Sequence, residues 1–454
     1  MRDLTQGPIP KHVVAMSVPI AAGMLLQTLY FFIDLYFVAR LGNAALAGVG
    51  TAGNVMFVVF ALTQALGVGT GALVSQAVGR KDQPEANLVF NQSVGMGAWM
   101  AAATILGGYA LSGPYMTMLG ADAATAQAGT TFLYWFLPGL ALQFPMVVMG
   151  SALRGTGIVK PTMVVQMLTV LLNAALAPVL IAGWGTGHAL GVAGAGLATS
   201  IATLAGNVVL AVYFVRLEKY VRFDPSQWAP RLATWKRLLS IGVPAGGEFA
   251  AMAVFTGTVY GIAGTFGPEA QAGFGIGSRI NQMIFLPAMA VAFAAAPIVG
   301  QNYGAKHAGR VRETFRVSAI ASALIMLAIT LACQFEAESM AHIFTSDPAV
   351  VEVTATFLRV ISWNFIAMGI VFTCSSTFQG LGNTWPSLLS MGGRVSVFVV
   401  LAFWLSHQPG FQLRQLWLLS VATATLQALF SLWLVRGQFR SRLGASAAAD
   451  PARA

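Results

Sequence analysis

Charged and reactive side chains are scarce in this chain of 454 residues. Only 9% of the residues are charged, whereas a soluble domain carries about 25%, and 57% are hydrophobic. There are two cysteines and five histidines, and no CxxC, HExxH, Walker or GxSxG pattern occurs. This scarcity argues against a soluble protein, a disulfide-stabilised domain and a metal-dependent or nucleophilic enzyme. We therefore expect no enzyme activity, no metal site and no bound cofactor.

Long apolar segments take the place of the missing charges, and the mean hydropathy is +0.72. Twelve such segments follow one another, each near or above the ~20 residues that a membrane-spanning helix needs. They lie near 12–38, 46–72, 91–112, 128–150, 160–181, 191–215, 238–264, 270–297, 315–335, 350–377, 385–406 and 413–436. The sequence therefore predicts an all-α integral membrane protein with twelve transmembrane helices.

The basic residues are unevenly placed along the chain. The net charge is +10, from 25 Lys and Arg against 15 Asp and Glu. If the N-terminus is cytoplasmic, 20 of the 25 basic residues fall in the tails and the loops of that side. Because cytoplasmic loops are enriched in Lys and Arg, we predict that both termini lie in the cytoplasm. The basic segment 216–237 is then a cytoplasmic linker, and 437–454 a cytoplasmic tail.

The first half of the chain is repeated in the second half. When residues 15–161 are shifted by 225 positions without a gap, unusual residues coincide, among them Pro19 with Pro244, Gly42 with Gly267, Lys81 with Lys306, Asp122 with Asp347 and Gly157 with Gly382. Six spans per half make the repeats parallel, with a pseudo-two-fold axis along the membrane normal, as in many secondary transporters. We predict two six-helix bundles around a central cleft: an N-lobe at 1–215 and a C-lobe at 238–436.

Two acids interrupt the predicted spans, Asp34 in the first helix and Glu248 in the seventh. An acid at the centre of a membrane helix costs about 2.5–3.5 kcal/mol, so such residues are usually functional. Loss of water favours the protonated carboxyl, which is what a proton-coupled exchanger requires. Asn173, Thr199 and Gln27 are available to assist Asp34. Neither acid is duplicated, because the shift pairs Asp34 with Val259 and Glu248 with Gly23.

Each of these acids also has a structural interpretation. Asp34 can be a solvated residue near the mouth of its helix, and Glu248 can form a structural ion pair with Arg279 of the eighth span. Arg394, by contrast, is close enough to the inner end of its span for its side chain to extend toward the interface, so we assign it no role.

Several motifs resemble those of the multidrug and toxic compound extrusion family, and they extend over nearly the whole chain. They include Ser17-Val18-Pro19, Ile33-Asp34, Ser75-Gln76, Gly79-Arg80-Lys81, Arg154-Gly155-Thr156-Gly157, Ile241-Gly242-Val243-Pro244, Gly300-Gln301-Asn302-Tyr303-Gly304 and Gln379-Gly380-Leu381-Gly382. The resemblance implies two helical bundles and cation-driven export of organic, mostly cationic drugs by a monomer. It implies cation coupling by Asp34, assisted by Asn173 and Thr199. Many members carry an acid where this chain has Ala177, and the missing carboxylate favours protons over Na⁺.

The sequence thus predicts a proton-coupled multidrug antiporter of a bacterial inner membrane, with small organic cations as substrates and no nucleic-acid partner. Asp34, Asn173 and Thr199 form the predicted coupling site. Glu248, Arg279, Tyr30 and Gln27 form the predicted substrate site or a second coupling site. The alternatives are a Na⁺-coupled drug antiporter and a flippase for a lipid-linked precursor. A flippase is expected to need several cationic residues for phosphate, whereas only Arg279 and Arg394 lie within spans.

Overall fold

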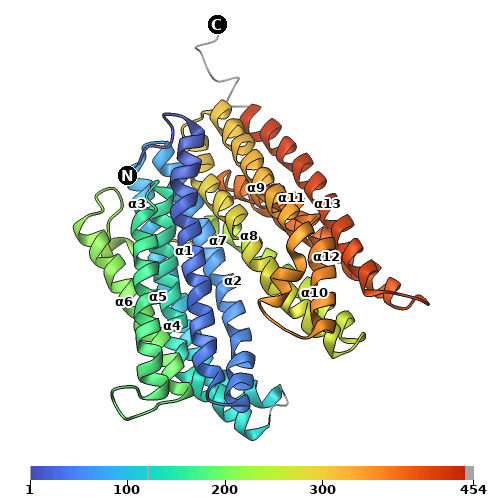
Figure 1. Ribbon diagram of the computed structural model, residues 1–454. Helices are drawn as coiled ribbons and strands as arrows, with labels where there is room; N and C mark the ends of the chain where they lie inside the picture. The colour runs from blue at the N-terminus through green and yellow to red at the C-terminus, as the bar shows by residue number, and fades with distance from the viewer. Residues whose placement is uncertain (1, 120–121, 445–454) are drawn as a thin grey trace. The chain divides into compact units, whose positions relative to one another are not determined.

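The computed structural model describes residues 2–119 and 122–444, apart from the side chains of Tyr30, Phe31, Phe32, Asp34 and Leu35. Within these residues the chain is built from helices joined by short connections (Figure 1). The α-helices are α1 (Ile9–Ala39), α2 (Asn43–Gly79), α3 (Gln83–Met118), α4 (Ala123–Gly155), α5 (Lys160–Ala182), α6 (Val192–Arg216), α7 (Leu232–Gly264), α8 (Pro268–Gly304), α9 (Ala308–His342), α10 (Pro348–Ile361), α11 (Asn364–Gly380), α12 (Trp385–Ser406) and α13 (Leu413–Gln438). The short turns η1 (Pro225–Gln227) and η2 (Phe439–Leu443) complete the description. The predicted all-α class is confirmed.

Eleven described helices are long and apolar enough to cross a membrane, and the bent pair of α10 and α11 makes a twelfth if it is counted as one span. This pair corresponds to the predicted single span 350–377, which is in fact broken, with a bend of 56°. The break exposes backbone carbonyls that α9 satisfies. Thr330 donates to the carbonyl of Ser362 at 2.9 Å, and Gln334 donates to the carbonyl of Arg359 at 2.7 Å. Satisfied carbonyls make the break tolerable at membrane depth.

The chain divides into two compact units. The first contains Met1–Asp3 and Ala22–Val243, and the second contains Leu4–Ala21 and Pro244–Ala454. Both boundaries fall inside long helices, close to Pro19 of α1 and at Pro244 of α7. The predicted lobes, 1–215 and 238–436, therefore differ from these units at the first turns of α1 and α7.

The repeat is visible in the backbone of the connections. Several residues with positive φ come in pairs 225 positions apart, among them Gly42 and Gly267 (105° and 107°), Lys81 and Lys306 (60° and 61°), and Gly157 and Gly382 (79° and 71°). A positive φ is uncommon for residues other than glycine, so the shared value at the two lysines indicates one inherited turn. Asp122 and Asp347 are also equivalent, since each caps the helix that follows it, α4 and α10.

The linker 216–237 belongs to the first unit and is fastened to α3. Asn91 donates to the carbonyl of Arg222 at 2.8 Å and accepts from the amide of Asp224 at 2.8 Å and the indole of Trp228 at 3.0 Å. Gln92 similarly donates to the carbonyls of Gln227 and Ala229 and accepts from the amide of Arg231. Two adjacent amide side chains thus satisfy backbone groups along most of a segment that has little helix of its own.

Candidate functional site

The first candidate site lies in the first unit, where α1, α5 and α6 carry the predicted coupling residues. Asp34 and Tyr30 belong to α1, but their side chains lie outside the described part of the chain, so their roles stay predictions. Asn173 and Thr199 are described and are neighbours. The amide nitrogen of Asn173 lies 3.5 Å from the hydroxyl of Thr199, and the two residues are 0% and 5% exposed.

Thr199 is held in place within α6. Its hydroxyl donates to the carbonyl of Ala195 at 3.2 Å, one turn earlier. One turn after Asn173 stands Ala177, which is fully buried. The buried contact between α5 and α6 therefore presents an amide and a hydroxyl, and an apolar methyl group at the position where the resembled family often has a second acid.

Gln27 lies apart from this buried pair, on an exposed part of α1. Its side-chain carbonyl accepts from the amide of Gln166 in α5 at 3.1 Å. One turn before it, a Cβ atom on Gly23 would lie 2.6 Å from the side-chain oxygen of Gln166. Gln27 thus takes part in a close contact between α1 and α5, and its predicted role as a substrate residue stays a prediction.

The second candidate site lies in the second unit, around Glu248 at the middle of α7. The carboxylate accepts from the hydroxyl of Ser375 in α11, at 3.2 and 3.3 Å to its two oxygens. Ser375 in turn accepts from the hydroxyl of Ser387 in α12 at 2.7 Å and from the amide of Gln379 at 3.4 Å. Two helices, α11 and α12, therefore place neutral hydrogen-bonding groups beside a half-buried acid on α7.

Glu248 and Arg279 are not brought together. Arg279 is exposed on α8, and within the described residues no ion pair joins it to Glu248. The structural ion pair that the sequence left open is therefore not formed. An acid with hydroxyl neighbours and no fixed cation can instead accept a proton or a mobile cation.

Arg394 corrects a second prediction. Its side chain does not extend to the interface, because Arg394 is only 8% exposed and lies nine residues into α12, about 14 Å along the helix axis. It contacts α7, α11 and α13, as described below. The sequence contains one indication of this burial: Arg394 is far from both ends of its span.

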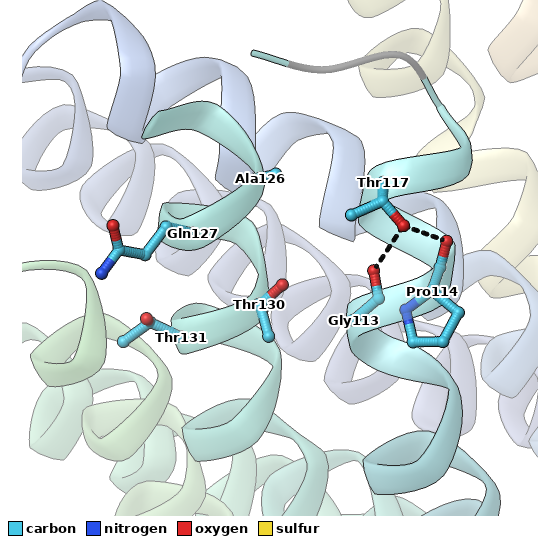
Figure 2. A pocket seen from close by; sticks show the side chains of 7 residues that line it. All are labelled: Gly113, Pro114, Thr117, Ala126, Gln127, Thr130 and Thr131. Carbon is cyan, nitrogen blue, oxygen red and sulfur yellow. Dashed lines mark hydrogen bonds between the residues drawn. The ribbon is translucent and has the colours of Figure 1, made fainter. Parts of the chain in front are cut away.

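A surface pocket of about 530 Å³ lies elsewhere in the first unit, between the end of α3 and the start of α4. Figure 2 shows its lining, to which Gly113, Pro114 and Thr117 contribute from α3 and Gln127, Thr130 and Thr131 from α4. Thr117 donates to the carbonyls of Gly113 and Pro114, at 3.2 and 2.9 Å. The lining has no charged residue and none of the predicted site residues, so we do not place the functional site there.

Comparisons with known proteins agree with the repeat. The MatE family model matches twice, at residues 19–179 and 244–404, and the two matches are 225 residues apart at both ends. A probable multidrug resistance protein of Bacillus subtilis, YoeA, is 23% identical over 410 residues, which is 88% of each chain. The multidrug export protein MepA of Staphylococcus aureus is 24% identical over 380 residues, 83% of each. A solved MOP superfamily transporter from Pyrococcus furiosus has the same fold, with 24% identity, a TM-score of 0.91, and coverage of 97% of this chain and 98% of that one.

Proposed function

Since this chain belongs to the MatE family, we propose that it is a secondary active exporter of the bacterial inner membrane, which exchanges organic cations for protons. The names of its relatives support drug export, because YoeA and MepA are described as multidrug resistance and export proteins. The apolar helices support a multi-pass membrane protein. The distribution of basic residues supports cytoplasmic termini. We propose that it acts as a monomer.

The proposed coupling site is Asp34 with Asn173 and Thr199. The observation that carries it is the buried contact between Asn173 and Thr199 at 3.5 Å. These two residues are far apart in sequence, and both were selected as partners of the same acid. In this mechanism Asp34 takes up a proton from outside and releases it inside. The neutral amide and hydroxyl can hydrogen-bond either form of the carboxyl, so the site tolerates both protonation states.

Protons suit this site better than Na⁺. A hard cation without its water needs several oxygen ligands around it. The position one turn after Asn173 supplies only the buried methyl group of Ala177, so a second carboxylate is missing from this face of α5. A single carboxyl, in contrast, is sufficient to carry a proton. Sodium coupling is the alternative and would shift the site toward Glu248.

Glu248 is the proposed contact for a cationic substrate in the second unit. Its carboxylate accepts from the hydroxyl of Ser375 and has no fixed counter-charge among the described residues. A bound lipophilic cation would neutralise this carboxylate. A carboxylate in apolar surroundings is more stable with a counter-charge than without one, and a weakly hydrated cation loses little on leaving water. Small organic cations are therefore the proposed substrate class.

The test is transport of ethidium by purified protein in liposomes. An imposed pH gradient, acidic on the side from which protons enter, should drive ethidium in the opposite direction, and Asp34→Asn should abolish this transport. If only a Na⁺ gradient drives ethidium transport, the coupling ion is Na⁺ and not the proton. No transport under either gradient would contradict drug export and favour a lipid flippase. Among the described residues of the second unit one arginine, Arg394, is buried, which is fewer cations than the diphosphate of a lipid-linked precursor should require.

A further inference from the structure

Arg394 is a buried arginine that the coupling mechanism does not use. Its Nη1 atom donates to the side-chain oxygen of Gln427 in α13 at 3.2 Å and lies 3.2 Å from the sulfur of Met368 in α11. The guanidinium carbon lies 4.9 Å from the ring centroid of Phe255 in α7, a cation–π distance. All of these neighbours are neutral. They position the guanidinium without balancing its charge.

The positive charge lacks a partner within the described residues. The ion pairs found there, Arg237 with Glu85 and Arg359 with Glu338, lie elsewhere. The Nε atom of Arg394 is buried and has no hydrogen-bond acceptor. Removing an arginine from water without a counter-charge costs several kcal/mol, so a buried arginine normally pairs with an anion. A guanidinium with an unused N–H is suited to a carboxylate, which can accept two of its hydrogen bonds in parallel.

Glu248 is too far away to be this anion in the structure. Phe255, which Arg394 contacts, follows Glu248 by seven residues on α7, about two helical turns or 10 Å along the axis. Arg394 follows Ser387, a neighbour of the Glu248 site, by the same seven residues on α12. The acid and the arginine thus lie on the same faces of α7 and α12, two turns apart.

Hydroxyl groups occupy the interval between them. Ser390 of α12 and Ser431 of α13 are hydrogen-bonded at 2.6 Å, and both are buried. Arg394, one turn after Ser390 in α12, and Gln427, one turn before Ser431 in α13, form the next hydrogen-bonded pair. A row of polar side chains therefore lies along α12 between the two sites, with a carboxylate at one end and a guanidinium at the other.

We propose that Arg394 binds the carboxylate of exported solutes, so that the second unit accepts zwitterions with their cationic group at Glu248 and their carboxylate at Arg394. This inference rests on the proposed export function and specifies its substrate class. Arg394 then acts as a specificity residue: it is needed for carboxylate-bearing solutes and dispensable for purely cationic ones. Gln427 positions it.

Two dyes that differ by one methyl group test the proposal. Tetramethylrhodamine carries a free carboxylate, whereas its methyl ester is a cation with the same ring system. In liposomes, Arg394→Gln should raise the KM for tetramethylrhodamine about tenfold and leave that for the methyl ester unchanged, because only the acid loses a charge-assisted hydrogen bond. Arg394→Lys keeps the charge but not the planar fork of the guanidinium. Its KM for tetramethylrhodamine should therefore lie between those of the wild type and Arg394→Gln. Arg414→Gln, at an exposed arginine of α13, is the matched control.

Equal losses for both dyes, or no loss for the acid, would overturn the proposal while leaving drug export intact. If the wild type transports ethidium but neither rhodamine, the inference fails while drug export stands; if it transports none of the three, both fail. A binding measurement on the wild type avoids dependence on the folding of variants. Fluorescence anisotropy should show that benzoate displaces tetramethylrhodamine and that methyl benzoate does not. Displacement by both compounds alike would also overturn the carboxylate site.

Discussion

The two units share their turns but differ in their buried polar groups. Positive φ values recur at pairs such as Lys81 and Lys306, within a few degrees. The ionisable residues inside the spans do not recur: Asp34, Glu248 and Arg394 correspond to Val259, Gly23 and Thr169. Backbone geometry at a turn depends on local φ and ψ and changes little after duplication. Charges in a membrane bundle depend on the packing of each unit and can diverge.

The packing explains why the acids are not interchangeable. Val259, the counterpart of Asp34, is 2% exposed and belongs to the apolar core of the second unit. Gly23, the counterpart of Glu248, stands where any side chain would meet Gln166 of α5. Each unit therefore has its own packing contact where the other carries its acid, and an acid placed there would have to displace it. The difference is compatible with the proposed division of labour, with coupling in the first unit and substrate charge in the second.

The largest effect is expected from the acid of the first unit. Asp34→Asn should reduce ethidium transport driven by a pH gradient to the level of protein-free liposomes, because an amide cannot exchange a proton near neutral pH. Asp122→Asn is the matched control, since asparagine also caps a helix and Asp122 lies outside the spans. Residual gradient-driven transport by Asp34→Asn would place the coupling acid elsewhere.

Moving the acid into the second unit should not restore coupling. In the double variant Asp34→Asn, Val259→Asp, the new carboxyl is buried among apolar side chains at a cost of about 2.5–3.5 kcal/mol. A thermal melt followed by tryptophan fluorescence should therefore show a marked loss of stability relative to Asp34→Asn alone. Val259→Thr, which is isosteric, should cost less. A stable and active double variant would show that the two units are equivalent after all.

The acid of the second unit should affect affinity more than coupling. Glu248→Gln should raise the KM for ethidium about tenfold, which corresponds to about 1.4 kcal/mol, with little change in maximal rate. Steady-state transport over a range of ethidium concentrations measures both. Glu269→Gln, at an exposed acid at the start of α8, should have no effect. Loss of gradient coupling in Glu248→Gln would instead assign the coupling site to the second unit.

Much of this architecture could be predicted from the sequence. Apolar segments of membrane-spanning length show the helices, and Gly, Lys and Asp at fixed offsets show the repeat, because both are local constraints. The break between α10 and α11 could not be predicted, since it depends on Thr330 and Gln334 from a different helix. Which side chains of a neighbouring helix reach such a break depends on the packing of the helices, and one sequence does not show that packing.

The candidate sites show the same limit. The sequence indicates Asp34 and Glu248 as candidates because an acid in an apolar run is conspicuous, and it indicates Asn173 and Thr199 through a family resemblance; their roles stay predictions. The environment of Arg394 was misjudged. Its burial depends on Gln427 and Phe255, which are contributed by α13 and α7. Distance from the ends of a span is therefore a better indicator of burial for an arginine than its potential reach.

The smallest effect concerns the linker, which is fastened to the first unit through Asn91. Asn91 corresponds to Arg316, a side chain that cannot both donate to and accept from a backbone.

Within the linker, the hydroxyl of Ser226, at 2.6 Å, holds the pKa of Asp224 below its ordinary value. This stabilisation is present above the ordinary pKa of a free aspartate and is lost only as the pH falls through the lowered value. The Asp224 turn should therefore be insensitive to pH in the neutral range.

Asn91→Leu should loosen the linker without affecting transport. It removes the acceptor of the Asp224 amide and of the Trp228 indole and the donor to the Arg222 carbonyl, three bonds worth about 1 kcal/mol each. Hydrogen exchange measured by mass spectrometry should then be about tenfold faster or more over 220–231, while the spans keep their protection. Arg316→Leu, at the equivalent position of α9, should leave the linker unchanged. Unaltered exchange in Asn91→Leu would mean that Gln92 and the aromatic contacts of Phe90 with Phe223 suffice to hold the linker.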